Sequence, residues 1–350
     1  MQIFHLDTSL LPEKAFYIPL HRTQPLRSRI ASIPTVYRLL VLVILVAALS
    51  FYGRWVYVMN APNMGVPVKW EYHCKTHAPF NKTLYDHTPR ARILVGLLTK
   101  DSTFLRRQLI RSTYLQYQPP TIIFRFILGR PQKEYLPLVA EEMRLYGDVI
   151  VLDMEENMNE GKTLEYFKWV NRSYNQTNGE YARLDYVVKA DDDSMINLWN
   201  LERALRVLPR KGAYWGCKYS ILNSDYVGKS FMGGECYGLS SDLVHWIATD
   251  PLPSAYPSGH EDSQVHRWLR WGHQNATYIA ENCYIFDGPQ ANSVYSRPYG
   301  KTPSSIPGQE RETIVVHGLK TEEDFLEAGR WILPSAADAN RNASLVNQSM

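Results

Sequence analysis

The sequence lacks a large excess of charge of either sign. Its 350 residues include 38 Lys and Arg against 35 Asp and Glu, which gives a formal net charge of +3 at pH 7. No basic stripe appears along the chain, so we expect no nucleic-acid partner. The 45% hydrophobic content still suffices for a sizeable core, in one large domain or two small ones.

Cysteine is scarce, and its spacing excludes the usual zinc motifs. The four cysteines, Cys74, Cys217, Cys236 and Cys283, include no pair with C-x-x-C spacing. One or two disulfides are expected in an oxidising compartment; the sequence leaves their pairing open, and buried thiols are the alternative. A G-x-S-x-G nucleophile motif is also absent, which argues against a hydrolase of that type.

One apolar run without charge, residues 39–53, lies near the N-terminus. It is shorter than the ~20 residues that span a bilayer, but Arg54 can reach the membrane surface and the apolar stretch continues beyond it. We therefore predict a transmembrane signal-anchor over residues 39–58, after a cytosolic tail over residues 1–38. The length of that tail disfavours a cleaved signal peptide, and a buried soluble helix is the alternative.

Basic residues before this run predict a cytosolic N-terminus and a lumenal remainder, the single-pass type II arrangement. All the N-x-S/T sequons follow the run, which agrees with that orientation. These candidate N-glycosylation sites are Asn81, Asn171, Asn175, Asn275, Asn342 and Asn347. We expect the Golgi membrane as the location, with the endoplasmic reticulum as the alternative.

The remainder divides into three parts. Residues 59–90 show no apolar periodicity and are interpreted as a lumenal stem, and residues 334–350 as a flexible polar tail. Residues 91–333, interpreted as the catalytic domain, alternate strand patterns with helical ones. The expected strands are 91–99, 121–129, 148–154 and 186–193, and the helices between them are 104–117, 132–147 and 161–174.

This alternation predicts an α/β domain whose mostly parallel sheet has helices on both faces. Later elements are expected as helices at 199–208, 262–271 and 321–332 and as a strand at 312–319. The last helix begins with Thr321 and Asp324 spaced as a capping box. Because ligands of such sheets gather at the carboxyl ends of strands, the acidic end of the fourth strand is the first candidate site.

That strand ends in VVKADDDSMIN, residues 187–197, which holds three adjacent carboxylates. Alternate side chains of a strand share a face, so we expect Asp191 and Asp193 on one side and Asp192 on the other. Two close carboxylates suit a divalent cation such as Mn²⁺ or Mg²⁺. An Asp-x-Asp pair alone is a weak indication, because many solvated turns contain one.

The same segment resembles the Asp-rich motif of the β-1,3-galactosyltransferase family (glycosyltransferase family 31), which also has N-acetylglucosaminyltransferase and fringe-like members. Other segments are similar to motifs of that family, in the same order along the chain. They are RRQLIRSTY (106–114), FILG (126–129), EEMRLYGDVIVLDMEE with GKTLEYFKW (141–169), MGGECYGLSSDLV (232–244) and GHEDSQV (259–265). The resemblance covers residues 91–332.

The resemblance implies a GT-A fold, a Rossmann-like mixed and mostly parallel sheet with flanking helices, preceded by one transmembrane helix. It also implies inverting transfer of a hexose from a UDP-sugar to a glycan hydroxyl, in β-1,3 linkage and with Mn²⁺ or Mg²⁺. Galactose is the first expectation for the sugar and N-acetylglucosamine the second. By position, Asp193, Asp191 and His317 would bind the metal and Asp262 would be the general base. A packed or solvated histidine is the alternative for His317.

Other residues are candidates for substrate contact, each with packing or solvation as the alternative. On the donor side these are Asp191, Asp192, Arg106, Arg107, Arg111, Lys162 and Lys189, whose charges suit uridine diphosphate and its cation. On the acceptor side they are Glu261 and the rings of Trp215, Tyr219 and Tyr237, which suit stacking on a sugar.

The chain departs from the family pattern after Asp262, where EDSQVHRW replaces the usual E-D-V-x-x-G. This change lies near the expected acceptor side and leaves the acceptor undetermined. A different class of function also stays open, a catalytically silent GT-A protein that binds glycans or chaperones a partner. The presence of the metal carboxylates and the candidate base favours the enzyme.

Overall fold

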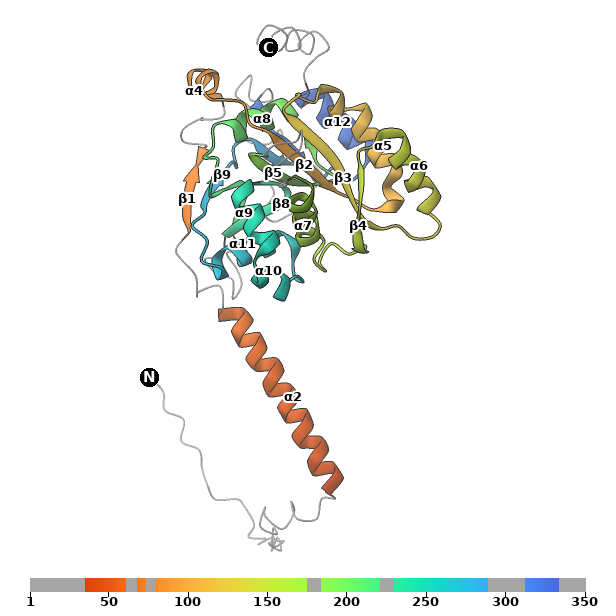
Figure 1. Cartoon of the computed structure of the whole chain (residues 1–350), viewed down its shortest axis with the longest axis vertical. Coiled ribbons are helices and arrows are strands. Elements are labelled where there is room, and N and C mark those ends of the chain that lie inside the picture. The colour runs from red at the N-terminus through yellow and green to blue at the C-terminus, as the bar shows by residue number, and fades with distance from the viewer. Residues whose placement is uncertain are drawn as a thin grey trace, which may run out of the picture. The chain divides into compact units, whose positions relative to one another are not determined.

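The computed structural model describes residues 35–60, 68–73, 80–174, 184–220, 230–288 and 312–333 (Figure 1). The chain divides into two units, Met1–Val58 and Met59–Met350, and each is described by itself. Helix α2 (Thr35–Asn60) runs through the described part of the first unit. No helix within the described ranges has both the length and the apolar character that a membrane crossing requires, so the predicted anchor over residues 39–58 is not confirmed.

Half of the main sheet in the second unit is parallel, in the order β5-β2-β3-β4. These strands are β2 (Ile93–Leu98), β3 (Ile122–Arg130), β4 (Val149–Glu155) and β5 (Tyr186–Asp191). Parallel neighbours need crossover connections. Here the crossovers contain α5 (Phe104–Ser112), α6 (Leu136–Tyr146) and α7 (Lys162–Tyr174). The alternation expected from the sequence is therefore confirmed.

The other half of the sheet is joined through one reversed strand, β8 (Ser230–Ser240), which is antiparallel to both of its neighbours. The order continues from β8 to β7 (Ala213–Ser220), β9 (Thr277–Ala280) and β1 (Lys69–Tyr72). Since β1 pairs with β9 along its whole length, this part of the predicted stem belongs to the sheet, which corrects the prediction.

A second, smaller sheet has the order β10-β11-β6. Its strands are β10 (Ile285–Asp287), β11 (Val315–His317) and β6 (Met195–Ile196). Short elements complete the described chain: α4 (Lys82–His87), η3 (Asp101–Thr103), η4 (Tyr114–Tyr117) and α10 (Pro251–Ala255).

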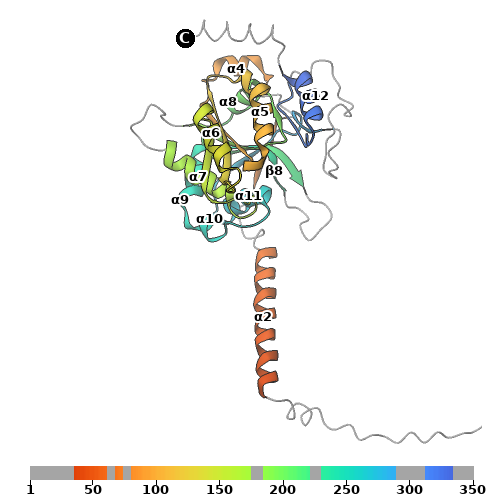
Figure 2. The same cartoon turned by 90° about the vertical axis from the view of Figure 1, so that its right-hand side faces the viewer.

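The two faces of the main sheet bury separate cores. Along β2, Ile93, Val95 and Leu97 belong to the core that includes α5, α8 (Leu198–Arg206) and α12 (Glu322–Ile332). The alternate residues Leu94 and Leu98 belong to the core of α7, α9 (Ser241–Thr249) and α11 (Glu261–Trp271). Figures 1 and 2 both show α9, α10 and α11 grouped together, apart from α12.

Helix α12 begins as the sequence predicts. The hydroxyl of Thr321 accepts a hydrogen bond from the backbone N–H of Asp324 at 3.1 Å and donates one to its carboxylate at 2.7 Å. The cap satisfies one of the backbone donors that a helix start leaves unpaired. It therefore fixes where α12 begins, shortly after the candidate ligand His317.

Candidate active site

Two carboxylates and one histidine meet at the end of β5. Asp191 is the last residue of that strand, Asp193 follows in the turn, and His317 is the last residue of β11. The ligand atoms that these three side chains offer all lie within 4.8 Å of one another. Carboxylate oxygens favour Mg²⁺ or Mn²⁺, and the imidazole favours Mn²⁺ of the two. The residues present therefore fit the cation that the acidic motif implies.

The smaller sheet orients the ring of His317. Asp287 lies opposite His317 in the β10–β11 ladder, and its Oδ1 is 2.9 Å from Nδ1 of the ring. Nε2 is then the nitrogen that faces Asp193, whose Oδ1 is 3.5 Å away. A carboxylate behind a histidine is the usual support of a metal ligand. Asp287 is a supporting residue that the sequence analysis missed.

The protonation states of His317 and Asp193 affect how this cluster would bind a cation. Burial lowers the pKa of His317, but the hydrogen bond to Asp287 and the charge of Asp193 outweigh it and raise the pKa to about 9. Burial raises the pKa of Asp193, but the positive charges of His317 and Lys320 hold it below its ordinary value. Cation binding must therefore release the imidazolium proton, which makes affinity rise with pH.

Lys320 is a second residue that the sequence analysis missed, although it follows His317 by only three positions. Its ammonium forms an ion pair with Oδ2 of Asp193, while most of its side chain is exposed. The backbone carbonyl of Lys320 accepts a hydrogen bond from Arg106 at 3.0 Å. A mobile cation at the edge of a metal cluster is suited to bind the phosphates of a nucleotide.

Lys189 links the metal cluster to helix α11. Its ammonium lies 2.8 Å from each of three acceptors, Oδ1 of Asp191, Oε2 of Glu261 and the carbonyl oxygen of Gly234. Burial lowers the pKa of Lys189, but the carboxylates of Asp191 and Glu261 raise it above its ordinary value. The side chain is fully buried, which corrects the expectation that it binds the donor. It positions Asp191 instead.

Helix α11 begins with two adjacent carboxylates in different surroundings. Glu261 is 7% exposed and accepts hydrogen bonds from Lys189 and from Oγ1 of Thr163 at 2.9 Å, which corrects its predicted place on the acceptor side. The side chain of Asp262 is 31% exposed. Burial raises the pKa of Asp262 to about 8, with the charge of Glu261 adding to the effect. Of the two, Asp262 is the better proton acceptor near neutral pH.

Strand β8 bulges where it passes this helix. Its ladder with β7 shifts register between Gly216 and Lys218, and residues 233–236 form the bulge. Bulges next to active sites redirect the chain. Here the backbone comes so close that a Cβ on Gly234 would lie 2.0 Å from Oδ1 of Asp262. Only glycine leaves room for the carboxylate in this position.

We expect Gly234→Ala to lower the rate of the reaction that Asp262 serves by about 10²-fold, because displacing a reacting group by about 1 Å has that effect. Gly238→Ala is the matched control on the same strand, since its Cβ would meet only side-chain atoms, the nearest at 3.3 Å. Steady-state kinetics and melting temperatures of both variants check the prediction. Equal rate losses in the two variants would show that crowding of Asp262 is not the cause.

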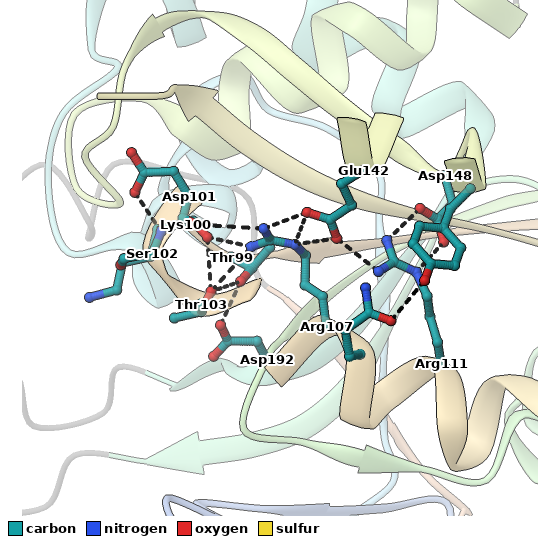
Figure 3. A network of polar contacts seen from close by, with 12 residues as sticks. Thr99, Lys100, Asp101, Ser102, Thr103, Arg107, Arg111, Glu142, Asp148 and Asp192 are labelled. Atoms are coloured by element: carbon teal, nitrogen blue, oxygen red, sulfur yellow. Dashed lines mark hydrogen bonds and ion pairs between the residues drawn. The ribbon is translucent and has the colours of Figure 1, made fainter. Parts of the chain in front are cut away.

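A polar network holds the loop that follows β2 (Figure 3). Oγ1 of Thr99 donates to Oδ2 of Asp192 at 2.6 Å, which ties the loop to the acidic turn. From α5, Arg107 donates to the backbone carbonyls of Lys100 and Asp101. Asp192, predicted to contact the donor, thus accepts a hydrogen bond from the loop that follows β2.

Arg107 and Arg111, predicted to bind the donor, bind protein carboxylates instead (Figure 3). Fully buried, Arg107 binds Glu142 with Nε at 2.9 Å and Nη2 at 2.7 Å. Arg111 binds Asp148 in the same bidentate way, at 2.8 and 2.7 Å, and also approaches Glu142. These pairs join α5 to α6 and β4. The prediction is wrong because both guanidinium groups already form ion pairs with carboxylates of the protein.

We expect Arg107→Met to destabilise the domain by about 3–5 kcal/mol, because it leaves the buried carboxylate of Glu142 without its main partner. Arg130→Met removes an exposed pair with Asp153 and Glu155 and is expected to cost about 1 kcal/mol or less. Urea unfolding of both variants measures the difference. Similar free energies of unfolding for the two would contradict the structural role of Arg107.

Three further residues that were expected to contact substrate are buried, so these predictions are wrong as well. The ammonium of Lys162 binds Oε1 of Glu156 at 2.6 Å. The indole N–H of Trp215 donates to Oε2 of Glu281 at 2.7 Å. Lys162, Trp215 and Tyr237 have no exposed surface, so neither ring offers a face on which a sugar could stack.

The sequon and cysteine predictions are only partly covered by the described residues. Asn81 and Asn275 are exposed and Asn171 is half-buried, whereas Asn175, Asn342 and Asn347 lie outside the described ranges. Glycosylation therefore stays a prediction. Cys283 is disulfide-bonded, and Cys217 and Cys236 are buried thiols; Cys74 lies outside the described ranges.

Sequence similarity to known proteins places part of this chain in the glycosyltransferase class. More particularly, residues 105–230 match the family model described as Galactosyltransferase. The matched range begins in α5 and includes the acidic turn after β5. The family expected from the sequence motifs is thereby confirmed.

Relatives with established names agree with this family. The β-1,3-galactosyltransferase pvg3 of Schizosaccharomyces pombe is 26% identical over 207 residues, which are 45% of this chain and 55% of pvg3. The hydroxyproline O-galactosyltransferase GALT2 of Arabidopsis thaliana is 21% identical over 177 residues, 45% of this chain and 25% of GALT2. The chain thus spans about half or less of these relatives. A mannosyltransferase from Pyrobaculum calidifontis, solved with GDP-Man and Mn²⁺, has 12% identity and a TM-score of 0.34 over 59% of this chain and 63% of its own.

Proposed function

We propose that this protein is an inverting, metal-dependent glycosyltransferase that moves a hexose from a UDP-sugar to a glycan hydroxyl. Galactose is our first choice of sugar, and a β-1,3 linkage is part of the proposal. One observation carries it: the cluster of Asp191, Asp193 and His317 is joined through Lys189 to the helix that bears Asp262. The galactosyltransferase family of residues 105–230 supports the choice of sugar.

The residues of the site have two separate tasks, metal binding at the end of β5 and proton acceptance at the start of α11. Asp191, Asp193 and His317 would hold a cation such as Mn²⁺, which when bound stabilises the charge that develops on a leaving diphosphate. At the other end Asp262 accepts the proton of the attacking hydroxyl, a task for which a pKa near the working pH is well suited. Attack from the side opposite the leaving group inverts the anomeric centre.

We further propose that helix α2 anchors the protein in the Golgi membrane as a single-pass type II protein, with the endoplasmic reticulum as the alternative. The uncharged apolar run at residues 39–53 and the basic tail before it support this arrangement. Extraction of cell membranes at alkaline pH tests it. Release of the full-length protein into the soluble fraction would contradict the anchor.

The decisive experiment measures UDP release by the purified full-length protein. UDP-galactose and UDP-N-acetylglucosamine are offered with Mn²⁺ or with a chelator, over a panel of simple glycan acceptors. We expect Mn²⁺-dependent release that one acceptor stimulates and that is faster with UDP-galactose. Absence of both release and Mn²⁺-dependent UDP binding would favour a catalytically silent glycan-binding or chaperone protein.

A further inference from the structure

One buried carboxylate of the site has no part in the chemistry described so far. Glu235 lies in the bulge of β8 and is 4% exposed. Its backbone carbonyl accepts a hydrogen bond from Oγ of Ser194 at 2.9 Å, beside the acidic turn. Its side-chain Oε1 is buried and has no hydrogen-bond partner among the described residues. Because buried polar atoms of native proteins are nearly always paired, this oxygen is a candidate acceptor for a group of the substrate.

The position of Glu235 lies between the two ends of the site. On one side, it lines the same cavity as Asp287, whose carboxylate is hydrogen-bonded to His317. On the other side, its neighbour Gly234 touches the carboxylate of Asp262. In a single displacement the reacting carbon lies between the leaving group and the attacking hydroxyl. The transferred sugar must therefore occupy the interval beside Glu235.

A small cavity of about 20 Å³ opens at Glu235 on the side of Asp287, the residue that orients His317. Its other lining residues are Cys217, Lys218, Tyr219, Asn282, Ile285 and Phe286. That volume admits one water molecule or one hydroxyl group and nothing larger. The half-buried ring of Tyr219 closes one wall, and a Cβ on Gly233 would collide with both this ring and the carboxylate of Glu235. The pocket is thus shaped for a single small polar group.

Two buried carboxylates elsewhere in the domain, Glu142 and Glu261, have different surroundings. Glu142 binds two arginines, and Glu261 accepts hydrogen bonds from Lys189 and Thr163. At Glu235, by contrast, Oε1 has no hydrogen-bond partner among the described residues, and a buried acceptor left unpaired contributes little to stability.

We propose that Glu235 accepts a hydrogen bond from a ring hydroxyl of the hexose in transfer and so determines which donor sugar is used. The inference rests on the proposed function and deepens it. Because the cavity admits a hydroxyl but not an N-acetyl group, the donor carries an unsubstituted hydroxyl at the position that meets Glu235. This favours galactose over N-acetylglucosamine, provided that position 2 is the one in contact.

The test compares the full-length wild type with Glu235→Ala, using UDP-galactose and its analogues deoxygenated at position 2, 3, 4 or 6. We expect the wild type to discriminate against one analogue by at least about 10²-fold in kcat/KM, and the variant by less than about tenfold. Affinity for UDP with Mn²⁺, which contains no sugar, is expected to stay unchanged. An equal loss of kcat/KM for all donors, or weaker UDP binding, would overturn the assignment.

Two control variants distinguish a loss of sugar recognition from a loss of folding, and the behaviour of the wild type tests the proposed function separately. Glu202→Ala removes another buried carboxylate, one that binds the hydroxyl of Tyr85, and is expected to leave the discrimination intact. Glu235→Gln keeps the shape and one acceptor oxygen, and is expected to retain more of the discrimination than Glu235→Ala. If the wild type turns over while Glu235→Ala still discriminates, this inference alone fails. If the wild type neither binds UDP nor releases it, the proposed function fails.

Discussion

Replacement of Asp193 by Asn is expected to lower sugar transfer by on the order of 10³-fold and to abolish Mn²⁺-dependent UDP binding in a folded protein. The reason is that Asp193 offers a ligand atom to the cluster with Asp191 and His317 and has its pKa held below the ordinary value. An amide keeps the shape but not the charge. Calorimetric titration with UDP, with and without Mn²⁺, and steady-state rates measure both effects.

The stability of the Asp193→Asn variant is the control for this result. The variant loses its ion pairs with Lys320 and with His317, each worth about 1 kcal/mol or less, so the expected cost is about 2 kcal/mol or less. Asp153→Asn, on the exposed edge of β4, is the matched substitution outside the site. Retained UDP binding in the presence of Mn²⁺, or an equal rate loss in Asp153→Asn, would contradict the metal assignment.

Asp262→Asn is expected to lower transfer by about 10²–10⁴-fold while UDP binding with Mn²⁺ is retained, because only proton acceptance is removed. With Asp262 as the base, kcat/KM rises with pH through the pKa of this carboxyl. That pKa is about 8 without a cation, and a bound cation lowers it, so the midpoint is expected below pH 8. Full activity of the variant would exclude Asp262 as the base.

Although Asp262→Asn lowers transfer, it is expected to raise the stability of the folded protein. A pKa raised in the folded state means that stability from Asp262 is full below the unfolded pKa of about 3.9 and is lost as pH rises toward about 8. Asp262→Asn should therefore exceed the wild type in free energy of unfolding, by an amount that grows between pH 4 and 8. Urea unfolding without divalent cations checks this, and an equal difference at pH 5 and pH 9 would contradict it.

The sequence predicts well those elements whose pattern depends on burial alone. Residues 93–98 form an uncharged, apolar run, and they are β2, which is buried on both faces. The predicted capping box at Thr321 is confirmed because it needs only residues three apart. The cluster of Asp191, Asp193 and His317 was also predicted, through a resemblance to family motifs rather than through physical pattern.

Other features depend on tertiary contacts that the local sequence pattern does not indicate. Strand β1 carries charges at Lys69 and Glu71 and is only four residues long, so its local pattern predicts a stem and gives no sign of the pairing with β9. Arginine is usually exposed, and only the buried Glu142 on a different helix explains why Arg107 is not. Glu235 resembles any polar residue of a strand, and its place in the bulge of β8 depends on the pairing with β7.

The small sheet β10-β11-β6 has a consequence for biosynthesis. Strand β6 follows Asp193 closely along the chain, but its partner β11, which carries His317, is made more than a hundred residues later. A ribosome must therefore synthesise almost the whole domain before the third ligand can reach the first two. A nascent chain halted before β11 would already contain Lys189, the partner of Asp191, but would have neither His317 nor Lys320 to pair with Asp193.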